Sequence, residues 1–223
     1  MVTSGARIQH SAATRPLTFK RVAGYAAILA GVVGILYSFS FVVLVVGGKA
    51  PALGVLLSSL FLMLGGLLSS AALVAIFNLV CETNPAPAIW GMLLALIGAL
   101  GSVIHGGYDL ANAIHPPASN VPSLADLPSQ IDPRGLLTFG VAGLGLFVLA
   151  SLIARSDHFP KRLGMLGYAL AILLVVIYLG RLIILSPTNP VVAVLVVVTG
   201  FIVNPAWYIW LGLALLRVQA TSA

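Results

Sequence analysis

Six runs of apolar residues, each longer than about 18 residues, constrain this chain more than any other feature of its sequence. A soluble domain carries about 25% charged residues, whereas only 7% of these 223 residues are charged and 60% are hydrophobic. Hydrocarbon admits only helices and closed β-barrels, and the runs lack the alternation of barrel strands. The sequence therefore predicts an all-α polytopic membrane protein, a bundle of six transmembrane helices in one domain.

The predicted six-helix domain covers residues 21–217, between cytoplasmic tails at 1–20 and 218–223. The spans are expected at about 22–46, 53–80, 88–114, 135–154, 163–185 and 191–216. The first run is too long for the apolar core of a signal peptide, so it is interpreted as a retained span. Pro87, Pro133 and Pro190 stand where first helical turns should begin, and Asp132 and Asn189 are expected to cap two of those helices.

The orientation of the spans is predicted from the basic residues that flank them. Eight of the eleven Lys and Arg residues fall on one set of flanks, and three fall on the other or just inside a span. The larger set is Arg7, Arg15, Lys20, Arg21, Arg155, Lys161, Arg162 and Arg217, and the smaller set is Lys49, Arg134 and Arg181. The positive-inside rule then places both termini in the cytoplasm. The net charge of +6 is explained by this bias and by anionic lipid headgroups, so no nucleic-acid partner is expected.

A polar stripe stands out in the third span. His105, Tyr108, Asp109 and Asn112 are spaced i, i+3, i+4 and i+7, so they share one helix face. With a rise of about 1.5 Å per residue, His105 lies roughly 25 Å and Asp109 roughly 32 Å along this span, and Arg181 roughly 27 Å along the fifth. An Asp109–Arg181 ion pair is therefore predicted. The alternative for Arg181 is that its side chain snorkels to the outer headgroups.

The polar stripe and Arg181 have several chemical interpretations. Four interpretations are open: a structural cluster, a binding site for a small molecule, lipid headgroup or quinone, a proton-coupled transport site, and part of a metal site. A metal needs three or four ligands, and no ligand spacing links His115, Asp126 and Asp132 to His105. A haem held by two histidines is disfavoured, because no other span contains a histidine. The tentative ligand-binding set is His105, Tyr108, Asp109, Asn112 and Arg181.

Catalytic residues, metal ligands and a cofactor are not assigned by the sequence. None of the metalloprotease, nucleotide-binding or nucleophile-elbow motifs occurs. No predicted loop is long enough for a soluble catalytic domain, so an enzymatic role is not favoured. The Pro-rich loop 115–133 is either a lid over the polar stripe or a plain connector.

Small residues recur at four-residue spacing within the spans, which allows helices to approach closely. Such spacing builds the bundle itself or forms the face of a homodimer. The pairs are Gly65/Ser69, Gly66/Ser70, Gly91/Ala95 and Gly98/Ser102.

Three segments carry a resemblance to known proteins: Arg21-Val-Ala-Gly-Tyr25, Asp132-Pro-Arg-Gly-Leu-Leu-Thr-Phe139 and Asn204-Pro-Ala-Trp-Tyr-Ile-Trp-Leu-Gly212. In these segments and in its overall plan the chain resembles bacterial six-span integral membrane proteins of an uncharacterised family. The resemblance implies a six-span fold across most of the chain. It implies no activity and assigns no functional residues.

Two functions are expected, both in the plasma membrane of a prokaryote with the lipid bilayer as the immediate partner. The first is a non-enzymatic scaffold or accessory subunit, as a homo-oligomer or within a larger membrane complex. The alternative is a small transporter or a lipid, quinone or small-molecule binder with an outer-facing polar site on the third span. A binder or transporter requires a cavity that reaches the polar stripe, whereas a scaffold predicts a stripe closed by protein.

Overall fold

The computed structural model describes residues 19–115, 132–184 and 189–220, and within these ranges the chain is helical with no strand. The helices are α1 (Phe19–Phe39), η1 (Ser40–Val46), α2 (Pro51–Val80), α3 (Pro85–Ile114), η2 (Pro133–Gly135), η3 (Leu136–Val141), α4 (Ala142–Arg155), α5 (Lys161–Ile183), α6 (Pro190–Val198), η4 (Thr199–Val203) and α7 (Asn204–Ala220). These segments join into six continuous helices that are long and apolar enough to cross a membrane. The expected all-α bundle of six apolar helices is confirmed.

Proline and asparagine mark where the helices begin. Pro51, Pro85, Pro133 and Pro190 each occupy the first turn of a helix, where a missing N–H loses no hydrogen bond. The side chain of Asn189 accepts a hydrogen bond from the amide of Val191 at 3.0 Å, which caps α6 as expected.

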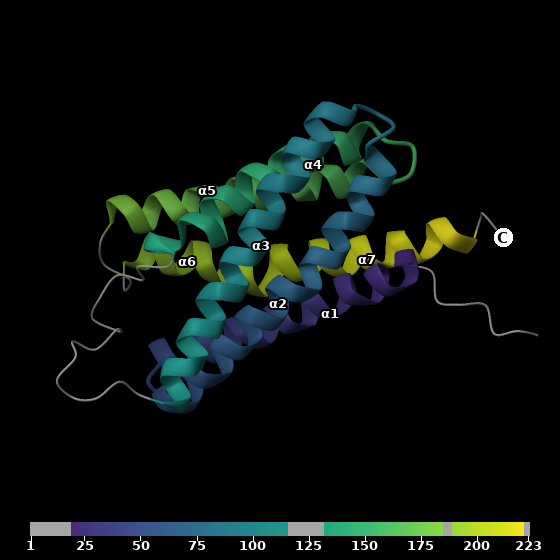
Figure 1. The fold of residues 1–223 in the computed structure, drawn as a ribbon. Coiled ribbons are helices and arrows are strands. Elements are labelled where there is room, and N and C mark those ends of the chain that lie inside the picture. The colour runs from purple at the N-terminus through teal and green to yellow at the C-terminus, as the bar shows by residue number, and fades with distance from the viewer. Residues whose placement is uncertain (1–18, 116–131, 185–188, 221–223) are drawn as a thin grey trace, which may run out of the picture.

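The six helices form a closed ring. Neighbours in the sequence pack side by side from α1 to α5, and α7 packs along α1 to complete the circuit (Figure 1). The junction between α5 and the sixth helix, formed by α6, η4 and α7, is the most sparsely packed one in the ring. A ring of this kind leaves a central space that the inward-facing side chains must either fill or line.

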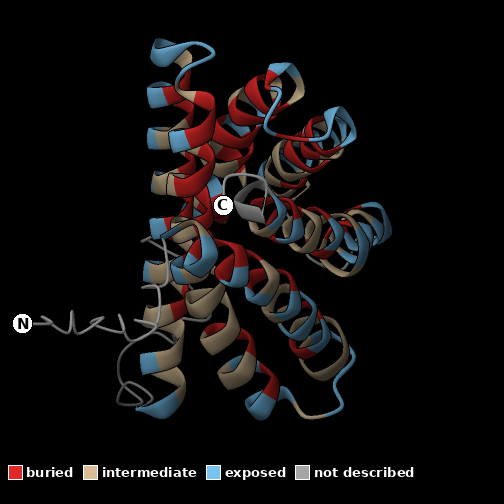
Figure 2. Ribbon diagram, turned by 90° about the vertical axis from the view of Figure 1, so that its right-hand side faces the viewer, coloured by how far each residue is buried: buried red, intermediate tan, exposed pale blue. Residues whose placement is uncertain are grey.

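The two ends of the bundle differ in packing. The start of α1 and the end of α7 lie at the same end, here called the terminal end (Figure 1). Large buried side chains such as Ile76, Leu149, Ile153, Leu163 and Leu215 belong to the half nearer this end. Buried residues, red in Figure 2, face neighbouring helices, while exposed ones lie on the outside. The opposite end, here called the distal end, contains the central cavity described below.

Glycines let the helix backbones touch. A Cβ added at Gly106 would lie 2.6 Å from both the amide nitrogen of Met63 and the carbonyl oxygen of Ser59 on α2. At Gly98 and Gly145 an added Cβ would overlap Ala142 and Ala95 of the adjoining helix. In lipid such close packing, rather than hydrophobicity, holds helices together. These small residues are therefore engaged inside the bundle.

The substitution Gly106→Ala should destabilise the bundle, because the new methyl group meets the α2 backbone rather than a flexible side chain. Overpacking of this kind costs about 1–3 kcal/mol of unfolding free energy. The neighbouring change Gly107→Ala is the matched control, since its Cβ would find only the Met63 sulfur at 3.7 Å. Denaturant titration in mixed micelles measures both, and equal stability of the two variants would contradict the proposed contact.

Candidate functional site

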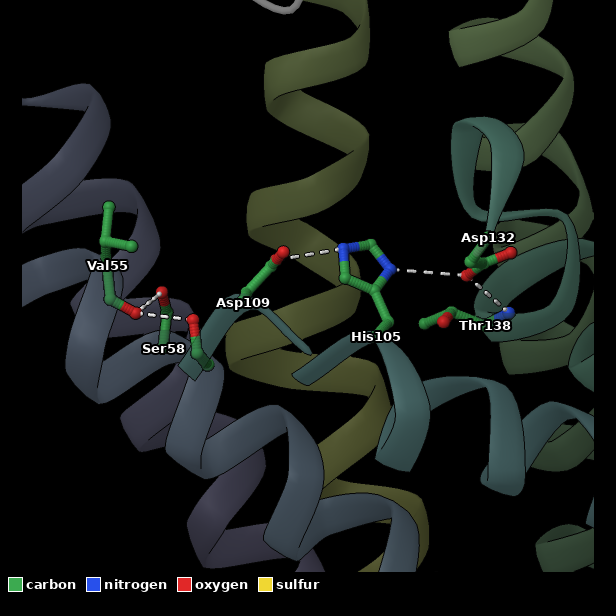
Figure 3. A network of polar contacts seen from close by, with 7 residues as sticks. Val55, Ser58, His105, Asp109, Asp132 and Thr138 are labelled. Atoms are coloured by element: carbon green, nitrogen blue, oxygen red, sulfur yellow. Dashed lines mark hydrogen bonds and ion pairs between the residues drawn. The ribbon is translucent and has the colours of Figure 1, made fainter. Parts of the chain in front are cut away.

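The side chain of His105 lies between two carboxyl groups (Figure 3). Its Nε2 atom is 3.2 Å from Oδ2 of Asp109, one turn later on α3, and its Nδ1 atom is 3.4 Å from Oδ2 of Asp132. The two acids differ in environment, because the side chain of Asp132 is fully buried and that of Asp109 is 42% exposed. Both ring nitrogens can donate at once only in the imidazolium form, which is the form that this geometry favours.

Asp132 organises the beginning of the fourth helix. Its Oδ1 accepts a hydrogen bond from the amide of Leu137 at 2.7 Å, and its Oδ2 accepts one from the amide of Thr138 at 3.2 Å. The chain turns back through Arg134 and Gly135, which have φ values of 59° and 81°. Burial disfavours charge on Asp132, but the hydrogen bonds from His105 and from the two amides outweigh burial and lower the pKa of this carboxyl group to about 2.

The sequence predicts that Asp132 caps a helix beginning at Pro133, but its side chain makes no capping bond in that turn and instead accepts the amides of Leu137 and Thr138, five and six residues later. Its contact with His105 does not follow from the sequence either. The two residues are 27 positions apart and belong to different helices. A histidine on one helix and a capping acid before the next were separate observations in the sequence. Only the packing of α3 against the start of the fourth helix joins them.

The predicted Asp109–Arg181 ion pair is wrong. Both residues lie within the described part of the chain, and among its ion pairs Asp109 contacts His105 instead. The guanidinium of Arg181 lies over the ring of Phe139, 5.4 Å from its centroid. Counting residues along a span gives the depth of a side chain but not its direction around the helix axis. His105, one turn away on the same helix, is the closer partner.

A cavity of about 380 Å³ lies inside the ring and is lined by residues from all six helices. His105, Asp109 and Arg181 from the predicted set line it, whereas Tyr108 and Asn112 do not. At 1.5 Å per residue, Asp109 and Arg181 lie within roughly 8 Å of the distal ends of their helices. Apolar residues such as Leu73, Leu146 and Leu170 line the deeper part. The cavity thus has a charged distal end and a mostly apolar deeper part, whose lining also includes Ser69, Asn204 and Tyr208.

Hydroxyl groups also line the cavity, and the sequence analysis did not assign them. Ser38, Ser59 and Ser102 donate hydrogen bonds to carbonyl oxygens of their own helices, at 2.9, 2.7 and 3.2 Å. The hydroxyl of Thr199 differs, because it is buried and has no hydrogen-bond partner among the described residues. Buried polar groups are rarely left without a partner. Thr199 is therefore an unsatisfied residue in the cavity wall, and its enclosed hydroxyl has no surface open to the cavity itself.

Three of the six helices contain a π-helical segment beside this cavity. Phe41 belongs to η1, Thr138 to η3 and Thr199 to η4, and all three residues line the cavity. π-Helical turns are rare and occur frequently at functional sites. In the sixth helix the segment directly precedes Pro205, which lacks a backbone N–H. The backbone irregularities of this bundle therefore gather around one space.

Metal binding finds no support in the described residues, where no group of three or more His, Cys, Asp or Glu side chains could hold an ion. Asp126 and most of the loop expected at 115–133 lie outside the described residues, and so does the hypothesis that this loop is a lid.

Comparison of the chain with protein-family models, with curated proteins and with solved structures gives no match. The site itself is therefore the basis for a functional proposal.

Double-mutant cycles should separate the observed contact from the one that the sequence predicted. Asp132→Asn and His105→Gln are expected to be coupled, by about 0.5–3 kcal/mol of unfolding free energy, because the two side chains touch. Asp109→Asn and Arg181→Gln should be additive to within about 0.5 kcal/mol. Unfolding of the four single and two double variants in mixed micelles gives both values. Strong coupling between Asp109 and Arg181 would show that these two residues do form an ion pair.

Proposed function

We propose that this chain is a non-enzymatic integral membrane protein that binds or carries a small molecule in its central cavity. The observation that carries the proposal is the cavity itself, which reaches the charged distal end and is lined by all six helices. Its volume of about 380 Å³ falls in the range of small-molecule sites, which are mostly apolar with a few polar groups. The three π-helical segments beside the cavity support the same proposal.

A scaffold or accessory-subunit role, in a homo-oligomer or a larger membrane complex, stays a prediction beside this proposal. Most of the small residues expected to form a homodimer face instead pack between helices of this chain. Gly66, Gly91 and Gly98 each pack against a neighbouring helix of the same chain, whereas Gly65 is more open. A docking face for a partner would therefore have to use the larger apolar side chains on the outside of the ring.

The cellular setting is proposed from the sequence. The bias of basic residues supports a multi-pass protein of a prokaryotic plasma membrane with both termini in the cytoplasm. In that orientation the distal end of the cavity faces outward. Membership in the uncharacterised bacterial six-span family is likewise proposed, on the three segments that carry the resemblance.

Filling the cavity should abolish binding of an apolar probe. Gly65 lines the cavity, and a Cβ added there meets only Val33 at 3.8 Å, so the ring of a Gly65→Phe variant can enter the space. Radiolabelled decanol should bind saturably to the protein in phosphatidylcholine nanodiscs. The Gly65→Phe variant should bind it at least about tenfold more weakly, a loss of about 1.4 kcal/mol or more.

The matched control for this experiment is Gly107→Phe, which adds the same ring to a neighbouring helix at a position that does not line the cavity. Its decanol affinity should equal that of the native chain, with empty nanodiscs as the blank for partition into lipid. Equal binding by both phenylalanine variants, or uptake that never saturates, would count against the cavity as a binding site.

The proposed orientation predicts which turns a membrane-impermeant maleimide can reach. Thr83 and Lys49 lie in exposed turns at the terminal and distal ends, respectively. With Cys81 replaced by Ser, Lys49→Cys should react in intact cells, and Thr83→Cys should react only after the membrane is permeabilised. The reverse pattern would show the opposite orientation. Labelling of both sites in intact cells would contradict the proposed membrane-spanning arrangement.

A further inference from the structure

We propose that the ligand of the cavity is a single-chain amphipathic anion whose acidic head group pairs with Arg181 and whose apolar chain extends toward the terminal end. This inference rests on the proposed function and names its ligand class. The relevant head groups are a carboxylate and a phosphate monoester, which share the chemistry that a guanidinium recognises.

The distribution of satisfied and unsatisfied charge favours an anion over a cation. Both carboxyl groups near the distal end already have hydrogen-bonding partners, since Asp109 contacts His105 and Asp132 accepts two backbone amides. Arg181 also lines the cavity, but within the described residues its recorded side-chain contact is the face of the Phe139 ring. Arg181 therefore lacks an oppositely charged partner within the described residues, and an anion can supply one.

The position of Arg181 makes an unneutralised charge expensive. Charged side chains in or beside hydrocarbon normally face a cavity and find a partner there. A guanidinium presents several N–H donors in one plane, which suits the paired oxygens of a carboxylate or phosphate. The guanidinium lies over the ring of Phe139, 5.4 Å from its centroid, a cation–π contact that uses the charge of the group rather than its N–H donors. This arrangement holds the cation in place without consuming its hydrogen-bonding capacity.

The shape of the cavity fits a head group at one end and a chain at the other. Arg181 is two residues from the end of α5, whereas Leu146 and Leu170 lie roughly 20 Å from the distal ends of their helices. Leucine, alanine and glycine predominate in this deeper part. A diacyl lipid has two chains, and the cavity volume of about 380 Å³ suits one.

The test compares three probes with the same ten-carbon chain in phosphatidylcholine nanodiscs: decanoate, decyl phosphate and neutral decanol. The native chain should bind at least one anion more tightly than decanol. Arg181→Gln should weaken binding of that anion by at least about tenfold, as expected when a charge-assisted hydrogen bond is lost. Arg181→Lys should recover part of the affinity. Arg155→Gln, at the terminal end and outside the cavity lining, is the matched control and should change nothing.

The outcomes separate this inference from the proposed function. Retained decanol binding by Arg181→Gln shows that the variant is folded and its cavity intact. Two results would contradict the inference and leave the proposed function standing. In the first, decanol binds saturably but neither anion binds more tightly than decanol. In the second, Arg181→Gln binds the anions as tightly as the native chain, which means that Arg181 only extends toward lipid headgroups. If none of the three probes binds saturably, the proposed function fails together with the inference. A preference for decanoate or for decyl phosphate identifies the head group.

Discussion

In hydrocarbon every backbone N–H and C=O group must be hydrogen-bonded within the protein, and the six long apolar helices of this structure are compatible with that requirement. It forces the apolar runs to be helices and confines irregular backbone to places where other protein groups or a cavity compensate. The π-helical segments η1, η3 and η4 follow this rule, because each contributes residues to the central cavity. Helix association then depends on close packing, and glycines such as Gly106 and Gly145 permit it.

The bundle divides this packing unevenly along its axis. Near the terminal end, large side chains such as Trp207 and Leu211 are fully buried in the core. Toward the distal end, the same ring surrounds serine, threonine and charged side chains and leaves a cavity. A tightly packed half can hold six helices in a fixed arrangement while the other half stays hollow. The division explains how a chain with few polar residues can both be stable and keep a site open.

The charged residues at the distal end of the bundle are held in different ways. Asp132 is the most constrained of them, because it accepts two backbone amides of the fourth helix and contacts His105. This contact ties α3 to the beginning of the next helix across the undescribed segment 116–131. Arg181 is held by a ring instead of an acid. His105 and the two carboxyl groups contact one another, and the ligand proposal depends on Arg181, which has no acidic partner among the described residues.

The sequence by itself determined the fold class, the number of apolar helices and the helical face shared by His105 and Asp109, because these depend on composition and on the helical period. It also indicated the cap at Asn189, since capping is local. The tertiary structure alone decided that His105 meets Asp132, that Arg181 meets Phe139 rather than Asp109, and that Thr199 lines a cavity. Those contacts depend on how each helix is rotated and packed against its neighbours. Residue spacing within one helix carries no information about that rotation.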